Sequence, residues 1–259
     1  MLKVFKYSFL DLMRNRWTIA YALFFALCSA GLLYLSGDGN KVIVSAMNIV
    51  LLLVPLVSVI YGQMYLYQVR EYVELLLAQP ISRKAIFMGY YLGISTALSL
   101  SLLVGFMLPA LLLQPSYLLN TNWLLLIVIA VVLTFIFTGL ACWLVLKYDN
   151  RLKGFGAGLF IWLLLAVLYD GAILVILLLL EDYPLEKLAL VLSMLNPIDM
   201  GRMLLIFQLD YSALMGYTGA VFSHFFGTRL GGFILTFGFG VWLSFPIVLL
   251  LSKARKKDF

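Results

Sequence analysis

Long, nearly uninterrupted runs of apolar residues dominate the chain, and most polar residues fall in the segments between them. A helix needs about 20 apolar residues to cross the hydrocarbon core of a bilayer, and six runs reach that length. They cover residues 17–36, 42–67, 84–113, 122–146, 154–180 and 233–252. Only helices or closed barrels satisfy the backbone in lipid, and long Leu-rich runs favour helices. The pattern predicts an all-α membrane protein with six transmembrane helices.

The first 16 residues have a different pattern, in which charged and apolar residues alternate. On a helix, Leu2, Phe5, Phe9, Leu12 and Met13 would share one face, and lysines and arginines would occupy much of the rest. Such a segment is typical of an amphipathic helix that lies along the membrane surface. We therefore expect residues 1–16 to form an interfacial helix before the first span.

The segment before the last span, residues 181–232, is long and only partly apolar. An Asn-Pro pair and several charges interrupt it, so it is poorly suited to cross the membrane. A helical region that dips into the outer leaflet, or lies on it, fits better. With no stretch long enough for a separate soluble core, residues 1–259 are predicted to form one transmembrane domain.

Composition and charge support a membrane protein and give its orientation. Hydrophobic residues make up 64% of the chain and charged residues 12%. A soluble domain of this composition would expose large apolar patches and associate through them. With the N-terminus inside, only Lys41, Lys187, Arg202 and Arg229, of 18 basic residues, would lie outside. The positive-inside rule therefore predicts that both termini are cytoplasmic. It also explains the net charge of +6 without a nucleic-acid partner.

Motifs for catalysis or metal binding are missing from the sequence. There is no GxxxxGK[ST] loop for nucleotide phosphates, no HExxH, no GxSxG, and a single histidine, His224. The thioethers of Met194, Met200 and Met203 could contact Cu(I), but no closely spaced His or Cys joins them, so apolar packing is the favoured interpretation. We expect neither a catalytic nor a metal site on this chain.

The most specific pattern is the predicted inner connection, residues 68–83, which reads QVREYVELLLAQPISR. Val73, Leu76 and Leu77 form an apolar stripe on a short helix, and Pro80 ends it. The segment resembles the "RE…TLE.LL..P.SR" turn of type-2 ABC exporter permeases. Residues 89–93, GYYLG, resemble the "GK.LG" opening of that family's next helix, with Tyr90 where lysine is common. The alternative is an ordinary amphipathic loop.

This resemblance covers essentially the whole chain and implies a coupling role for the short helix. In the family that helix presses into a groove on a separate ATP-hydrolysing subunit, which holds the ATP and Mg. The N-terminal surface helix acts beside it. A second copy of the chain would complete the complex, because six spans make half of a two-fold transporter. The residues assigned to ATPase coupling by resemblance are Arg70, Glu71, Glu74, Leu76, Leu77, Pro80, Ser82 and Arg83.

Two further segments resemble one branch of the family, which serves the maturation of copper-containing nitrous oxide reductase in the bacterial inner membrane. They are Tyr169-Asp170 in the fifth span and residues 196–202, NPIDMGR. The resemblance implies that ATP-driven motion acts on a periplasmic protein of the NosD type. One alternative is an ABC-type exporter of lipid, drug or polysaccharide. Another is a stand-alone secondary transporter, which would show inverted repeats or several intramembrane charges.

The Asn-Pro pair also has a purely structural interpretation. Asn196 can cap a helix, Pro197 suits the first helical position, and Asp199 would lie in the first turn near the positive end of the helix dipole. A plain helix start therefore explains all three residues.

Asp170 is harder to explain by helix chemistry alone. It lies roughly 16 Å below the outer end of its span, at about 1.5 Å per residue. A carboxylate at that depth is costly unless it is paired or protonated. We expect Arg202, or a hydroxyl such as that of Tyr169 or Tyr61, to satisfy it.

Overall fold

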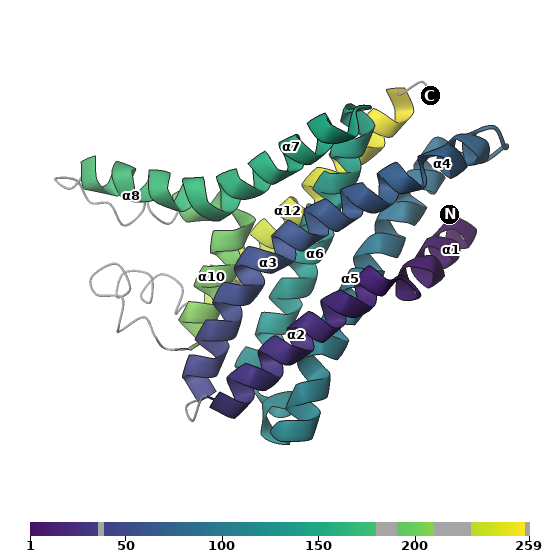
Figure 1. Ribbon diagram of the computed structural model, residues 1–259. Helices are drawn as coiled ribbons and strands as arrows, with labels where there is room; N and C mark the ends of the chain where they lie inside the picture. The colour runs from purple at the N-terminus through teal and green to yellow at the C-terminus, as the bar shows by residue number, and fades with distance from the viewer. Residues whose placement is uncertain (36–38, 180–190, 210–228, 257–259) are drawn as a thin grey trace.

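The computed structural model describes residues 1–35, 39–179, 191–209 and 229–256, and in that part of the chain all regular structure is helical (Figure 1). The elements are α1 (Leu2–Met13), α2 (Arg16–Leu35), α3 (Gly39–Gln68), α4 (Arg70–Leu77), α5 (Arg83–Leu113), η1 (Pro115–Leu119), α6 (Thr121–Lys147), α7 (Arg151–Leu163), η2 (Leu164–Leu168), α8 (Tyr169–Leu179), α10 (Pro197–Gln208) and α12 (Arg229–Lys256). The prediction of an all-α fold is confirmed.

Six helices in the described residues are long and apolar enough to span a membrane, as predicted. α2, α3, α5 and α6 agree with the predicted spans to within a few residues, and α7, η2 and α8 together form the fifth. Two starts are fixed by side-chain caps: Oδ1 of Asn120 accepts from the backbone at the start of α6, and Oδ1 of Asn150 does so for α7. α12 begins at Arg229 rather than at 233.

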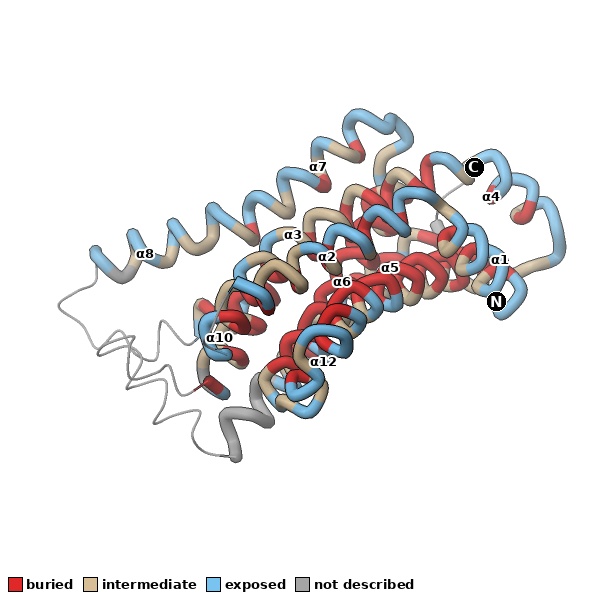
Figure 2. The backbone as a smooth tube through the Cα atoms, turned by 60° about the horizontal axis from the view of Figure 1, so that its bottom comes forward, coloured by how far each residue is buried: buried red, intermediate tan, exposed pale blue. Residues whose placement is uncertain are grey.

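α5 and α6 form the centre of the bundle, and the red, buried residues of Figure 2 concentrate along them. α1 and α2 pack on α5, while α3 and α12 pack on α6. Small residues let these helices approach: a Cβ on Gly105 of α5 would lie 2.9 Å from Cβ of Phe25, and one on Gly139 of α6 would lie 2.7 Å from Cβ of Pro246. Close backbone approach is how helices associate in lipid, where the hydrophobic effect between them is absent.

The fifth span, α7–η2–α8, is packed far less tightly than the others. Only 6% of its most apolar window is buried, against 67% for α6. In both views its α8 end extends away from the bundle (Figures 1 and 2). η2 is a turn of π-helix, which shifts the backbone hydrogen bonds from i+4 to i+5. The span is therefore a long helix fixed at a few points.

Both termini and α4 lie at one end of the bundle, called here the inner end; η1 lies at the opposite, outer end (Figure 1). Of the predicted outer region, 181–232, the structure describes 191–209 and the start of α12. α10 packs against α3, α6 and α12. A Cβ on Gly201 would lie 2.8 Å from Ile129 and 3.2 Å from Leu51, so α10 lies beside residues inside two spans.

Candidate functional site

α4, the helix at the inner end, has one buried and one exposed face. Val73 and Leu76 are buried, and Leu77 packs partly against the same core, so the predicted apolar stripe points into the chain. Glu71 and Glu74 are exposed. The outward face also carries two large apolar side chains, Leu75, which is 67% exposed, and Tyr72, which is 42% exposed.

The turn after α4 is exposed and joins it to α5. α4 ends at Leu77, and Pro80 follows in the turn, consistent with the predicted stop. Ser82 takes the extended conformation of an N-cap residue, although its side chain makes no capping bond, and its carbonyl accepts from the amides of Ala85 and Ile86. Arg83 is the first residue of α5.

α1 lies next to α4 and is tied to it by aromatic contact. The rings of Tyr7 and Tyr72 stack with centroids 5.4 Å apart. The hydroxyl of Tyr65 on α3 also donates to Oδ2 of Asp11 on α1, at 3.0 Å. The two helices that resemblance assigns to the ATPase contact therefore share one surface at the inner end.

The face of α1 that contacts the bundle differs in part from the predicted one. Val4, Ser8 and Leu12 are buried against α5, whereas Leu2 is exposed. The reason lies in α5: Gly89 and Gly93 leave room that Val4 and Ser8 occupy. Sequence spacing on α1 alone could not show that the partner helix offers a groove for small side chains.

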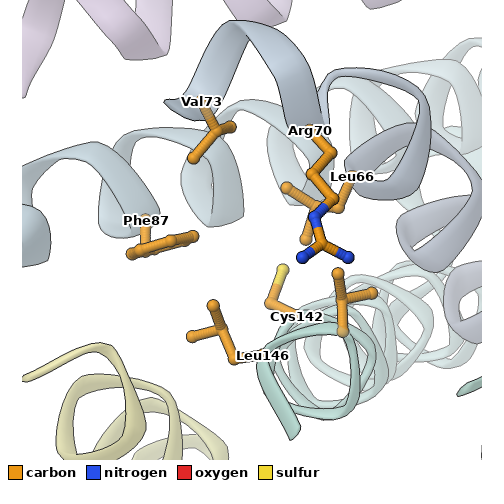
Figure 3. Close-up of a pocket in the computed structure, with 7 residues that line it drawn as sticks. Leu66, Arg70, Val73, Phe87, Cys142 and Leu146 are labelled. Carbon is orange, nitrogen blue, oxygen red and sulfur yellow. The ribbon is translucent and has the colours of Figure 1, made fainter. Parts of the chain in front are cut away.

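A small pocket lies behind α4, between α3, α5 and α6. Its walls are mostly apolar, and Arg70 reaches from α4 toward α6 above Cys142 (Figure 3). Nη2 of Arg70 is 3.0 Å from Oδ1 of Asp149, and Nε is 3.3 Å from Oε1 of Glu74. Arg70 therefore points into the chain and ties α4 to the loop between α6 and α7. The lining residues are Leu66, Arg70, Val73, Phe87, Cys142, Val145 and Leu146.

At the other polar site, Arg202 on α10 joins two carboxylates. Its Nη1 lies 2.7 Å from Oδ2 of Asp170 on α8 and 3.0 Å from Oδ1 of Asp199. The expected pairing of Asp170 with Arg202 is therefore present. The alternatives have other partners: the hydroxyl of Tyr169 donates to the carbonyl of Leu192 at 2.5 Å, and that of Tyr61 bonds Thr18 on α2.

Asn196 organises the same cluster from the start of α10. Its Oδ1 accepts from the amide of Ile198, as predicted for an N-cap, with Pro197 as the first helical residue. Its Nδ2 donates to Oδ2 of Asp199 at 3.0 Å and to the carbonyl of Leu165 in η2 at 2.7 Å. Leu165 belongs to the π-helical turn η2. The fifth span is therefore joined to the α10 segment at two points, at η2 through Asn196 and at α8 through Arg202.

Two carboxylates share one guanidinium here, and this changes the acidity of Asp199. Its side chain is 7% exposed. Burial first, and then the charge of Asp170, raise the pKa of Asp199 to about 7, although Arg202 and Asn196 act in the opposite direction. The buried position of Asp199 beside Asp170 thus favours the protonated form of its carboxyl more than an exposed position would.

Several contacts at these sites carried little signal in the sequence. Tyr7, Asp11 and Asp149 are ordinary residues for an interfacial helix and an inner loop, so the sequence did not indicate that they would form these contacts. Gln63 did carry a signal, because it is a polar residue inside an apolar run; its Nε2 donates to the carbonyl of Gly154 at 3.0 Å. The helical pattern could not tell which neighbouring helix it would meet.

The described residues contain no group of three or more His, Cys, Asp or Glu side chains placed to hold a metal ion. Met200 is buried, and a Cβ on Gly238 would lie only 2.4 Å from its methyl carbon, so the Met200 side chain packs between α10 and α12. His224 lies outside the described residues.

Comparison with known proteins adds independent information about this arrangement. The family described as "ABC-2 family transporter protein" matches residues 45–250. The chain is 27% identical over 223 residues to "Probable ABC transporter permease protein NosY" of Pseudomonas aeruginosa, covering 80% of this chain and 81% of that protein. A protein of the same name from Stutzerimonas stutzeri is 26% identical over 211 residues, covering 75% and 76%.

Proposed function

The chain belongs to the ABC-2 family of transporter proteins and is a permease subunit, and we propose that α1 and α4 form the surface on which its separate ABC ATPase acts. ATP and Mg bind to that ATPase. The observation that carries this proposal is the outward face of α4. Its two glutamates and two large apolar side chains lie at the inner end of the bundle. Contact with lipid does not account for an exposed leucine there, whereas an interface with a protein partner does.

The contact of Tyr7 with Tyr72 supports a single docking surface rather than two independent ones. A force applied to α4 reaches α1 directly through the stacked rings. The hydrogen bond from Tyr65 to Asp11 adds a contact between α1 and α3, the helix that leads into α4. Leu76 and Leu77, which resemblance assigns to coupling, act from inside: they hold α4 on the bundle while Glu71, Glu74 and Leu75 face the partner. Pro80, Ser82 and Arg83 set the turn that returns the chain to α5.

A substitution of Leu75 tests this surface. Burying a leucine at an interface contributes about 1.5–3 kcal/mol, so Leu75→Asp should weaken ATPase binding roughly 10- to 100-fold. Leu119→Asp is a matched control, because Leu119 is 88% exposed at the outer end. Retention of the ATPase by Leu75→Asp, measured by co-purification in detergent and by binding in nanodiscs, would contradict the proposal.

In the proposed complex two copies of the chain sit in the bacterial inner membrane above two ATPase subunits. The inner end faces the cytoplasm, so both termini are cytoplasmic; the excess of basic residues in the inner segments supports this orientation. Twofold symmetry is the commonest way to complete such an assembly. Cysteine accessibility at Leu119 from outside the cell, together with the mass of the purified complex, tests both statements.

We further propose that the complex moves a NosD-like periplasmic partner during copper-site maturation of nitrous oxide reductase. Support comes from the two NosY relatives and from the outer segment around α10, which is linked to a span. Cells that lack this chain should make reductase deficient in copper, and Leu75→Asp should fail to restore it. Normal copper content, with a lipid, drug or polysaccharide retained in the cell, would favour an ABC-type exporter instead.

A further inference from the structure

The junction between α3 and α4 and the junction between α6 and α7 exchange hydrogen bonds in both directions. Arg70 donates from Nη1 to the carbonyl of Asp149 at 3.2 Å and from Nη2 to its carboxylate at 3.0 Å. The hydroxyl of Tyr67, near the end of α3, donates to the carbonyl of Tyr148 at 2.7 Å, and Arg151 donates back to the carbonyl of Tyr67 at 3.2 Å. Four bonds thus cross between two segments far apart in sequence.

This loop leads directly into the fifth span. Oδ1 of Asn150 caps α7 by accepting from the amides of Leu152 and Lys153. Gly154 and Gly158 face α3, where Tyr67 and Gln63 fill the space that their missing side chains leave. The first two turns of α7 are therefore held to the end of α3 at the point where α4 begins.

Beyond those turns the span has few attachments. Nε1 of Trp162 donates to the carbonyl of Leu52 at 3.0 Å, and η2 and α8 contact α10 through Asn196 and Arg202. By contrast α3 and α5, which α4 also contacts, are packed on several sides: α5 against α1, α2 and α6, and α3 against α2, α6, α7 and α10. A helix with little buried surface moves at lower cost than one packed on several sides.

We propose that the loop 148–150, held by Arg70 and Tyr67, is the link that transfers movement of α4 to the fifth span, whose α8 end then displaces α10. Asp149 and Tyr67 are positioning residues for coupling; neither lies on the outward face of α4. This inference rests on the proposed function, since an ATPase must move α4. It adds the route by which movement leaves the inner end.

The test measures movement of α8 in the complex of chain and ATPase, reconstituted in nanodiscs. Spin labels are placed at Val175 on α8 and at Leu119, both exposed, with Cys28 replaced by alanine; Cys142 is buried. One labelled copy is paired with one unlabelled copy. Trapping the ATP-bound state should change the label distance by about 2 Å or more, the size of helix shifts in coupled proteins.

The variant Asp149→Ala/Tyr67→Phe should still bind the ATPase and hydrolyse ATP, but should lose at least half of that distance change. The side chain of Asp149 is 66% exposed, and phenylalanine keeps the ring of Tyr67, so the bundle should fold. Lys147→Gln removes a charge beside the same loop. The Lys147 ammonium lies over the rings of Trp143 and Tyr148 and makes none of the four bonds described above, so α8 should move in this variant as it does in the parent.

Two kinds of failure are distinguishable. If the parent chain binds no ATPase, the proposed function is wrong. If the parent binds and hydrolyses ATP but α8 does not move, or the double variant moves as far as the parent, the link is wrong. A loss in Lys147→Gln equal to that in the double variant would also overturn it, since the effect would then come from loop charge.

Discussion

Removal of the guanidinium that joins α8 to α10 should weaken the attachment of α10, although α10 still packs on α3, α6 and α12. In Arg202→Met, Asp199 would lose its one cation while remaining almost fully buried, and Asp170 would lose a partner at 2.7 Å. A hydrogen bond to a charged group contributes about 1.5–3 kcal/mol when buried. The Asp170 pair is about one-third exposed and contributes nearer to 1 kcal/mol. The sum is about 3 kcal/mol.

Amide hydrogen exchange along α10 measures this change directly, because local opening is what the ion pairs oppose. A loss of about 3 kcal/mol corresponds to roughly a 100-fold fall in protection, at 1.4 kcal/mol for each tenfold step. Arg202→Met/Asp199→Asn should recover part of it, since a neutral amide replaces the buried carboxyl that has lost the guanidinium. Equal protection in Arg202→Met and the parent would refute the idea that these ion pairs hold α10.

Three further predictions concern other contacts. Because the pKa of Asp199 is raised to about 7, the folded state binds a proton at this carboxyl that the unfolded state releases above about pH 4. The protection of α10 amides, corrected for the intrinsic effect of pH on exchange, should therefore fall as pH rises from about 4 through 7, and Asp199→Asn should flatten this dependence. Gly93→Val should overpack α5 against α1, cost about 1–3 kcal/mol and expose α1 to protease. Gly158→Ala, whose Cβ would lie 2.7 Å from the amide of Gln63, should lower the melting temperature by several degrees, whereas Gly156→Ala, with open space around it, should not.

The fold could be predicted to a large extent because membrane spans are decided by local composition. Each predicted span falls on a helix of nearly the same range. The starts of α6 and α7 are also marked by their N-cap residues, Asn120 and Asn150, which are typical capping residues. The packing order could not be predicted. Whether α1 meets α5 through Val4 and Ser8 depends on glycines some 85 residues away, at positions that look like any small residue in an apolar run.

The outer cluster was partly predictable for a different reason. A carboxylate inside a span demands a partner, and Arg202 is one of few basic residues outside the inner segments. The demand identified the pair Asp170–Arg202, yet it could not reveal that Asp199 shares the same guanidinium, because its position suits a helix start equally well. On α4, an amphipathic pattern showed which face is apolar, whereas the bond from Arg70 to Asp149 joins two exposed segments that no pattern relates.

The distribution of polar contacts explains why the fifth span differs from its neighbours. In lipid, apolar surface gains little by contact with another helix, so packing of small residues or polar bonds must hold a span in place. α5 and α6 use packing on several sides. The fifth span packs on α3 at Gly154 and Gly158, near its inner end, where Gln63 also bonds its backbone. Farther along it is held mainly by polar groups, among them Asp170, which pairs with Arg202. A span that is held by a few hydrogen bonds can break them and form others together. A span that is closely packed on several sides resists small displacements, because its side chains interdigitate. Among the six described spans the fifth has the smallest buried share, so it is the span that the proposed route expects to move.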